Sequence, residues 1–97
     1  MFYTYILKSK KVPGAIYKGY TKNLKSRLIQ HNSLLNQYSK KYAPWEIESY
    51  FAFSTEQQAK DFERYLKSSS GKAFMQKRLI SNSFKEALKK FNNGRLK

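Results

Sequence analysis

The chain has 97 residues and no cysteine, so it fits a single domain with one hydrophobic core and contains neither disulfides nor thiolate zinc sites. Its net charge of +14 attracts polyanions, which makes nucleic acid the expected partner. No apolar run approaches the roughly 20 residues that span a bilayer, and no secretory signal is recognisable, so we expect a cytoplasmic protein that makes no membrane contact.

Acidic residues are scarce in this sequence. The chain has 6 Asp and Glu residues against 20 Lys and Arg residues. The acids are Glu46, Glu48, Glu56, Asp61, Glu63 and Glu86. A nuclease with two metal ions usually clusters several carboxylates, which this chain can hardly supply. A single divalent cation, held by one carboxylate, water and a substrate phosphate, stays compatible with the composition.

The first part of the chain predicts an antiparallel hairpin. Phe2–Ser9 is rich in aromatic and β-branched residues, which is typical of a strand. A Pro13-Gly14 turn leads into a second strand over residues 15–20. Pairing of the two strands brings the tyrosines of the first strand, Tyr5 among them, beside Tyr17.

A helix is predicted over Leu24–Asn32, with Asn23 as its N-terminal cap. Four residues advance a helix by only about 40°, so Arg27 and His31 are neighbours at the edge of its buried stripe. An arginine can hold a phosphate through two hydrogen bonds, and a histidine can exchange a proton near neutral pH. This pair therefore indicates phosphodiester chemistry.

The middle of the chain predicts a loop followed by a third strand. Residues 33–45 are polar and basic, with Lys40 and Lys41 near their centre, and are interpreted as a loop. Residues 46–53 alternate in the pattern of a strand. The expected fold class is therefore α+β, an α/β sandwich in which helices flank a small, mainly antiparallel sheet of three strands.

The next helix is predicted over residues 55–67. Ser54 and Gln57 provide a hydroxyl and a glutamine at the spacing of a helix start. Glu63 lies at the border of the apolar stripe of this helix. It is therefore the carboxylate that points nearest to the core.

The C-terminal part is predicted to hold two more helices. Residues 68–71 interrupt the preceding helix, and a short basic helix covers residues 72–80. Its basic residues could meet a phosphate backbone; they are Lys72, Lys77 and Arg78. Residues 81–83 break the chain again, residues 84–91 form a packing helix, and residues 92–97 are expected to fray. We divide the chain into a domain over residues 1–80 and a basic helix within residues 81–97 that packs on it or extends it.

The order and spacing of these residues resemble a small GIY-YIG nuclease domain. Tyr3-Thr4-Tyr5 stands at the first name-giving element, and Tyr17-Lys18-Gly19 stands at the second. Further matches follow in order at Tyr20-Thr21, Leu24, Arg27, His31, Ser39-Lys40-Lys41, Pro44-Trp45, Glu63 and Leu66-Lys67. The likeness is nearest to the N-terminal nuclease domain of the bacterial repair excinuclease and to the eukaryotic structure-specific endonuclease.

The resemblance implies roles for five positions. Tyr17 would deprotonate the attacking water with help from a hydrogen bond of Tyr5, and His31 would orient or share the proton. Arg27 would stabilise the phosphate in the transition state, and Glu63 would bind one divalent cation, Mg²⁺ or Mn²⁺. The positions expected to contact nucleic acid are Lys18, Gly19, Lys40, Lys41, Lys67, Lys72, Lys77 and Arg78.

Other interpretations stay open. Taken singly, Tyr5 and Tyr17 fit ordinary sheet residues, Arg27 and His31 a solvated helix edge, and Glu63 a salt-bridge partner. The chain could also be a catalytically weak nucleic-acid-binding module, or one part of a nuclease whose partner protein supplies specificity. DNA is the expected substrate, with branched or damaged DNA among the candidates. The sequence does not decide between duplex, branched and single-stranded substrates, or between DNA and RNA. The oligomeric state is not predicted.

Overall fold

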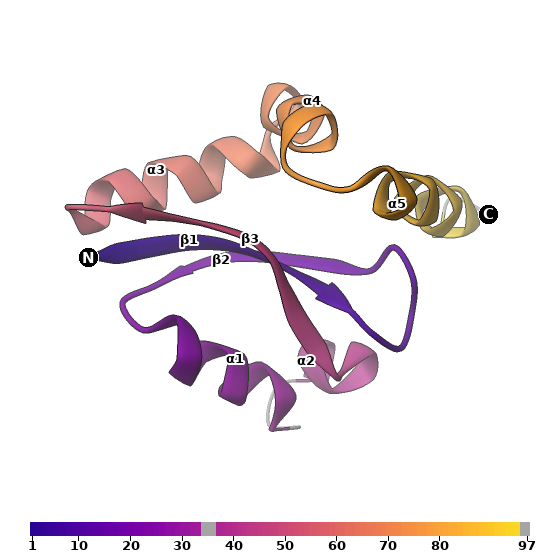
Figure 1. Cartoon of the computed structure of the whole chain (residues 1–97), viewed down its shortest axis with the longest axis horizontal. Coiled ribbons are helices and arrows are strands. Elements are labelled where there is room, and N and C mark those ends of the chain that lie inside the picture. Colours follow the sequence, from indigo (N-terminus) through magenta and orange to yellow (C-terminus); the bar gives the residue numbers. More distant parts are fainter. Residues whose placement is uncertain (34–36, 96–97) are drawn as a thin grey trace.

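A computed structural model describes residues 1–33 and 37–95, which form a three-stranded sheet with helices on both faces (Figure 1). The elements are β1 (Phe2–Ser9), β2 (Ile16–Thr21), α1 (Leu24–Asn32), α2 (Gln37–Tyr42), β3 (Trp45–Phe53), α3 (Glu56–Lys67), α4 (Ser69–Arg78) and α5 (Asn82–Arg95). In Figure 1, α3, α4 and α5 lie above the sheet, and α1 and α2 lie below it. The α+β fold predicted from the sequence is confirmed.

The sheet has the strand order β2-β1-β3, and both pairings are antiparallel. The predicted hairpin of β1 and β2 is present, with Tyr5 opposite Gly19. Strand β1 is the central strand, and the helices on the two sides of the sheet cover both of its faces: Thr4 and Ile6 are buried on one face, and Tyr5 and Leu7 on the other. Strand β2 is left as one edge of the sheet.

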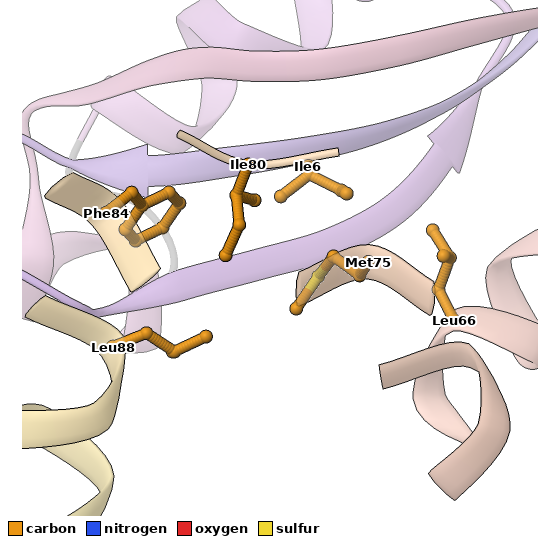
Figure 2. Close-up of a cluster of buried hydrophobic side chains, with 6 residues drawn as sticks. All are labelled: Ile6, Leu66, Met75, Ile80, Phe84 and Leu88. Atoms are coloured by element: carbon orange, nitrogen blue, oxygen red, sulfur yellow. The ribbon is translucent and has the colours of Figure 1, made fainter. Parts of the chain in front are cut away.

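The larger hydrophobic cluster lies between the sheet and the α3, α4 and α5 layer (Figure 2). Its buried members are Ile6, Leu66, Met75, Ile80, Phe84 and Leu88. Figure 2 shows Ile6 of the central strand facing these side chains, which come from three helices and the α4–α5 connection. Burying such side chains stabilises the fold by roughly 1.5–3 kcal/mol each, so α5 contributes directly to the main core. The division of the chain at residue 80 stays a prediction.

The opposite face of the sheet packs against α1 and α2. Tyr5, Leu7 and Trp45 form its buried cluster, and Leu24 and Leu28 of α1 pack against it. The Asn32 side chain at the end of α1 accepts a hydrogen bond from the backbone N–H of Trp45 at 2.6 Å and donates to its carbonyl oxygen at 3.1 Å. These bonds fix the end of α1 to the start of β3.

The prediction of a continuous loop over residues 33–45 is wrong, because the short helix α2 occupies residues 37–42. Its end is held by tertiary contacts: the Ser9 hydroxyl donates to the Tyr42 carbonyl oxygen at 2.6 Å. The Tyr42 ring also lies 6.2 Å from the Trp45 ring and 6.1 Å from the Phe91 ring, between ring centroids. Ser9 and Phe91 are distant from α2 in sequence, so no local pattern predicted the helix.

The predicted helix boundaries near the C-terminus are also corrected. The Ser68 hydroxyl accepts the Gly71 N–H at 3.1 Å, so Ser68 caps α4, which begins at Ser69 rather than at residue 72. The Ser81 hydroxyl accepts the Phe84 N–H at 3.2 Å, and α5 therefore begins at Asn82. Serines interpreted as helix breaks are helix caps. Helix α5 continues to Arg95, into the stretch expected to fray.

The start of α3 differs from its prediction only in the pair of residues that caps it. Thr55 and Gln58, rather than Ser54 and Gln57, form the capping box, and Glu56 is the first helical residue.

Within residues 1–33 and 37–95, no helix combines the length and the apolar character needed to cross a membrane.

Candidate active site

An open cleft lies at the β2 edge of the sheet, with a volume of about 390 Å³. Helices of both layers contribute to it, together with the hairpin. Its lining residues are Tyr5, Tyr17, Gly19, Tyr20, Thr21, Lys22, Arg27, Glu56 and Glu63. The cleft therefore gathers four of the five predicted catalytic residues, which come from β1, β2, α1 and α3.

The fifth predicted residue, His31, lies behind the two tyrosines. Its Nε2 is 3.1 Å from the hydroxyl oxygen of Tyr5, within hydrogen-bond distance. Its ring centroid lies 4.4 Å from that of Tyr17, and the rings of Tyr5 and Tyr17 are stacked 6.4 Å apart. His31 is buried and does not belong to the lining of the cleft.

Burial sets the protonation states of this cluster. Burial raises the pKa of Tyr5 above its ordinary value, Tyr17 and Glu63 raise it further, and Arg27 lowers it in part. Burial and the charge of Arg27 lower the pKa of His31 below its ordinary value. At neutral pH, Tyr5 is therefore a protonated phenol and His31 is a neutral imidazole.

Gly19 allows the Tyr5 side chain to reach the cleft. The two residues are partners across β1 and β2. A Cβ atom at position 19 would lie 2.6 Å from the Tyr5 hydroxyl oxygen and 2.8 Å from its Cζ, both closer than real Cβ contacts. The Tyr5 ring is 2% exposed and stacked on Tyr17, so it has little room to move away. Position 19 of β2 therefore requires a glycine, because the Tyr5 side chain passes over it.

Gly19→Ala is expected to lower the melting temperature and to displace the Tyr5 hydroxyl. Overpacking a buried site typically costs about 1–3 kcal/mol, and about 1 kcal/mol shifts the melting temperature of a domain of this size by roughly 4–8 °C. Thermal unfolding followed by circular dichroism measures the loss. In the double variant with Tyr5→Phe, which removes the closer of the two clashing atoms, the losses should be less than additive. Strict additivity would show that Tyr5 is not the residue that Gly19 accommodates.

Arg27 carries an unpaired buried donor. Asn23 caps the start of α1 by accepting the Ser26 N–H at 3.0 Å, which places Arg27 one turn into the helix, where its side chain lines the cleft. Its Nε is buried and has no hydrogen-bond partner among the residues that the structure describes. An unsatisfied buried donor is unfavourable, and a phosphate oxygen entering the cleft would satisfy it.

Glu63 contributes the carboxylate of the site from α3. Lys67, one turn later, donates a hydrogen bond from Nζ to its Oε2 at 3.0 Å. Glu56 lies two turns earlier on α3 and also lines the cleft. Within residues 1–33 and 37–95, no cluster of three or more His, Cys, Asp or Glu side chains could hold a metal ion. The donor set fits one hard cation with a single carboxylate ligand and the open cleft for water and phosphate oxygens.

The residues expected to contact nucleic acid fall into two groups. The first group consists of three lysines from β2, α3 and α4, namely Lys18, Lys67 and Lys72. Burial lowers the pKa of Lys18, and the nearby charges of Lys72 and Lys67 lower it further. Lys18 is also fixed by donating from Nζ to the Leu66 carbonyl oxygen at 3.0 Å. Gly19 lines the cleft itself. The others are exposed and lie outside the cleft lining; they are Lys40 and Lys41 on α2 and Lys77 and Arg78 on α4.

Four lining residues were not among the predicted site residues: Tyr20, Thr21, Lys22 and Glu56. Tyr20 and Thr21 were noted only as matches to the family pattern. Tyr20 to Lys22 follow Gly19 directly at the end of β2, so their position next to the second motif was the available signal. Glu56 and Glu63 are seven residues apart, which places them about 20° apart around α3. That spacing could have identified Glu56 as a neighbour of Glu63.

The two tyrosine motifs lie side by side in the hairpin, with Tyr5 of the first opposite Gly19 of the second. Residues 1–78 match the family model described as the GIY-YIG catalytic domain. The chain belongs to the GIY-YIG nuclease family. Helix α5 lies beyond the part that matches the GIY-YIG model, although Phe84 and Leu88 pack in the same core. No curated protein and no solved structure matches the chain, so the nearer likeness to the bacterial excinuclease and the eukaryotic structure-specific endonuclease stays a prediction.

Proposed function

We propose that this protein is a metal-dependent endonuclease that hydrolyses phosphodiester bonds in DNA. The observation that carries the proposal is the convergence of Tyr5, Tyr17, Arg27 and Glu63 on one cleft, although they come from four different elements. Membership of the GIY-YIG family supports nuclease chemistry. The net charge of +14 supports an anionic polymer as the substrate.

The environment of each tyrosine supports a division of roles. Tyr5 is nearly fully buried and its pKa is raised, so it keeps its proton and acts as a hydrogen-bonding group held by His31. Tyr17 is half-buried and lines the cleft, where its phenolate form takes the proton of the attacking water and becomes the phenol. Neutral His31, in contact with both rings, keeps the two phenols in place.

Charge complementarity assigns the remaining roles. Arg27, with its unpaired Nε, binds the non-bridging oxygens of the phosphate and stabilises the negative charge that develops on them. Glu63 would hold one divalent cation, Mg²⁺ or Mn²⁺, which when bound offsets negative charge on the leaving oxygen. Lys18, Lys67 and Lys72 then bind a phosphate next to the scissile one, because Lys67 contacts Glu63 and Lys18 lies near Glu63 and both other lysines.

The proposal is tested by incubating the purified protein with labelled linear, flapped, forked and four-way-junction DNA, with magnesium or with a chelator. Cutting that requires the metal is the expected result, and the preferred DNA form names the substrate class. The rival hypothesis, a GIY-YIG domain that binds DNA without cutting, predicts binding to the same DNAs without any product. Activity that appears only with an added partner protein would favour the partner-dependent nuclease.

The cytoplasmic location stays a prediction.

Tyr17→Phe is expected to lower the cleavage rate by about 10² to 10⁴, the usual contribution of a general base. The substitution keeps the ring that packs against His31 and removes only the hydroxyl. Single-turnover cleavage measures the rate, with Tyr5→Phe as the matched variant. A smaller loss is expected for Tyr5→Phe, since it removes a positioning hydrogen bond. Unchanged cleavage by Tyr17→Phe would exclude this residue as the base.

A further inference from the structure

Two exposed aromatic rings meet on the outer surface of α3 and α4. Tyr65 is 40% exposed and Phe74 is 38% exposed, and their ring centroids are 6.1 Å apart. Tyr65 follows Glu63 by two residues, a rotation of about 200° around α3, so the pair faces away from the cleft. The proposed catalytic chemistry uses neither ring. We name this pair the aromatic platform.

The Tyr65 ring of the aromatic platform is supported from behind. The Phe62 ring stacks on Tyr65, with centroids 6.0 Å apart and an interplanar angle of 27°. Phe62 in turn packs against Phe51 and Phe53 of β3, at 5.0 and 5.6 Å between centroids, and against the main hydrophobic cluster. A ring fixed in this way loses little further conformational entropy when a ligand stacks on it.

Positive charge lies beside Phe74 on the α4 side of the aromatic platform. Lys77 and Arg78 follow Phe74 by three and four residues, so they share its face of α4, and both are exposed. Asp61, one turn before Tyr65 on α3, accepts a hydrogen bond from the Gln57 side chain at 2.8 Å. Exposed aromatic rings beside exposed cations match the two parts of a single nucleic-acid strand, its bases and its phosphates.

We propose that Tyr65 and Phe74 form a stacking platform for the bases of a single-stranded nucleic acid, whose phosphates are bound by Lys77 and Arg78. A duplex keeps its base faces stacked inside the helix, so the platform selects an unpaired strand. Its position across α3 from the cleft gives the protein a second contact with a substrate that carries a single-stranded tail. The proposal does not require that the cleft cuts DNA.

The test measures binding by fluorescence anisotropy in the presence of a chelator, so that cleavage plays no part. The probes are a short labelled oligothymidylate, an abasic oligonucleotide of the same length and charge, and a blunt duplex. The wild-type protein should bind the oligothymidylate more tightly than the abasic strand. Tyr65→Ala with Phe74→Ala should weaken oligothymidylate binding about tenfold or more, as lost base stacking predicts, and should abolish that preference.

Matched variants separate stacking from charge and from folding. Tyr50→Ala removes another exposed ring, 55% exposed on β3, and should leave oligothymidylate binding unchanged. Lys77→Ala should weaken binding of the oligothymidylate and the abasic strand alike and should reduce the salt dependence of both. Circular dichroism and the melting temperature establish that each variant is folded. The double variant Tyr65→Leu with Phe74→Leu serves as a second test if the alanine variant does not fold, because it removes the rings but keeps apolar side chains at both positions.

Three outcomes would overturn the proposal. Equal affinity of the wild-type protein for the oligothymidylate and the abasic strand would leave only a charge contact. An equal loss of duplex and oligothymidylate binding in the double alanine variant would remove the preference for single strands. Unchanged oligothymidylate binding in that folded variant would assign the rings to another partner, such as a protein.

Discussion

Glu63→Gln is expected to abolish metal-dependent cleavage while DNA binding stays intact or improves slightly. Gln keeps the shape of the side chain but removes the charge that would hold the divalent cation. Losing several kcal/mol of transition-state stabilisation corresponds to a rate loss of roughly 10³ or more. The variant should stay folded, since the ion pair with Lys67 is largely exposed on the lysine side and such pairs contribute little to stability.

Two other acids serve as controls for Glu63→Gln. Glu86→Gln makes the same change in net charge on α5, outside the cleft lining, and should cleave at the wild-type rate. Glu56→Gln changes the other carboxylate of the cleft and should lower the rate less than Glu63→Gln. Cleavage rates and anisotropy-based affinities are measured on one DNA for all three variants. Retained cleavage by Glu63→Gln, or a larger loss from Glu56→Gln, would remove Glu63 from the metal role.

Arg27→Ala is expected to slow cleavage by about 10² to 10³, the typical loss when one charge-stabilising donor is removed. The buried Nε has no partner in the described part of the chain, so its removal leaves no other buried group unsatisfied. We therefore expect the free energy of unfolding to change by less than about 1 kcal/mol. Single-turnover kinetics and chemical denaturation of the same preparation measure the two effects.

Two further variants test the geometry at position 27. Lys25→Ala removes one positive charge from an exposed position of the same helix and should change only the salt-dependent affinity. Arg27→Lys keeps the charge but not the two-pronged hydrogen bond, so it should recover only part of the lost rate. Weaker binding with unchanged turnover in Arg27→Ala would make Arg27 a substrate-positioning residue instead.

The strongest sequence predictions were those with a local physical cause. Richness in aromatic and β-branched residues predicted β1 and β2, and a Pro-Gly turn predicted that they pair. The 3.6-residue period placed Arg27 at the helix edge and Glu63 at the border of its stripe, and both line the cleft. The catalytic roles of these residues stay predictions until the variants are measured.

The failed predictions concern a helix that distant contacts hold in place and two helix starts whose local signal was ambiguous. Helix α2 is fixed by Ser9 and by the rings around Tyr42, which come from β1, β3 and α5. The serines before α4 and α5 were ambiguous, because the same side chain favours a turn or caps a helix. At both serines, a contact of the neighbouring residues supports the helix that follows. Gly71 has no side chain, so α4 can pack closely against the Tyr65 carbonyl oxygen. The Glu48 carboxylate accepts the Ser81 N–H at 3.1 Å.

The sequence by itself determined the charge, the hairpin, the principal helices and the motif residues, because each depends on composition or on short-range periodicity. Only the tertiary structure decided that α1 and α3, on opposite faces of the sheet, bring Arg27 and Glu63 to the same edge strand. It also decided that His31 lies behind the tyrosines and that Gly19 gives Tyr5 its room. These arrangements depend on strand order and on packing between residues far apart in the chain, which no local pattern encodes.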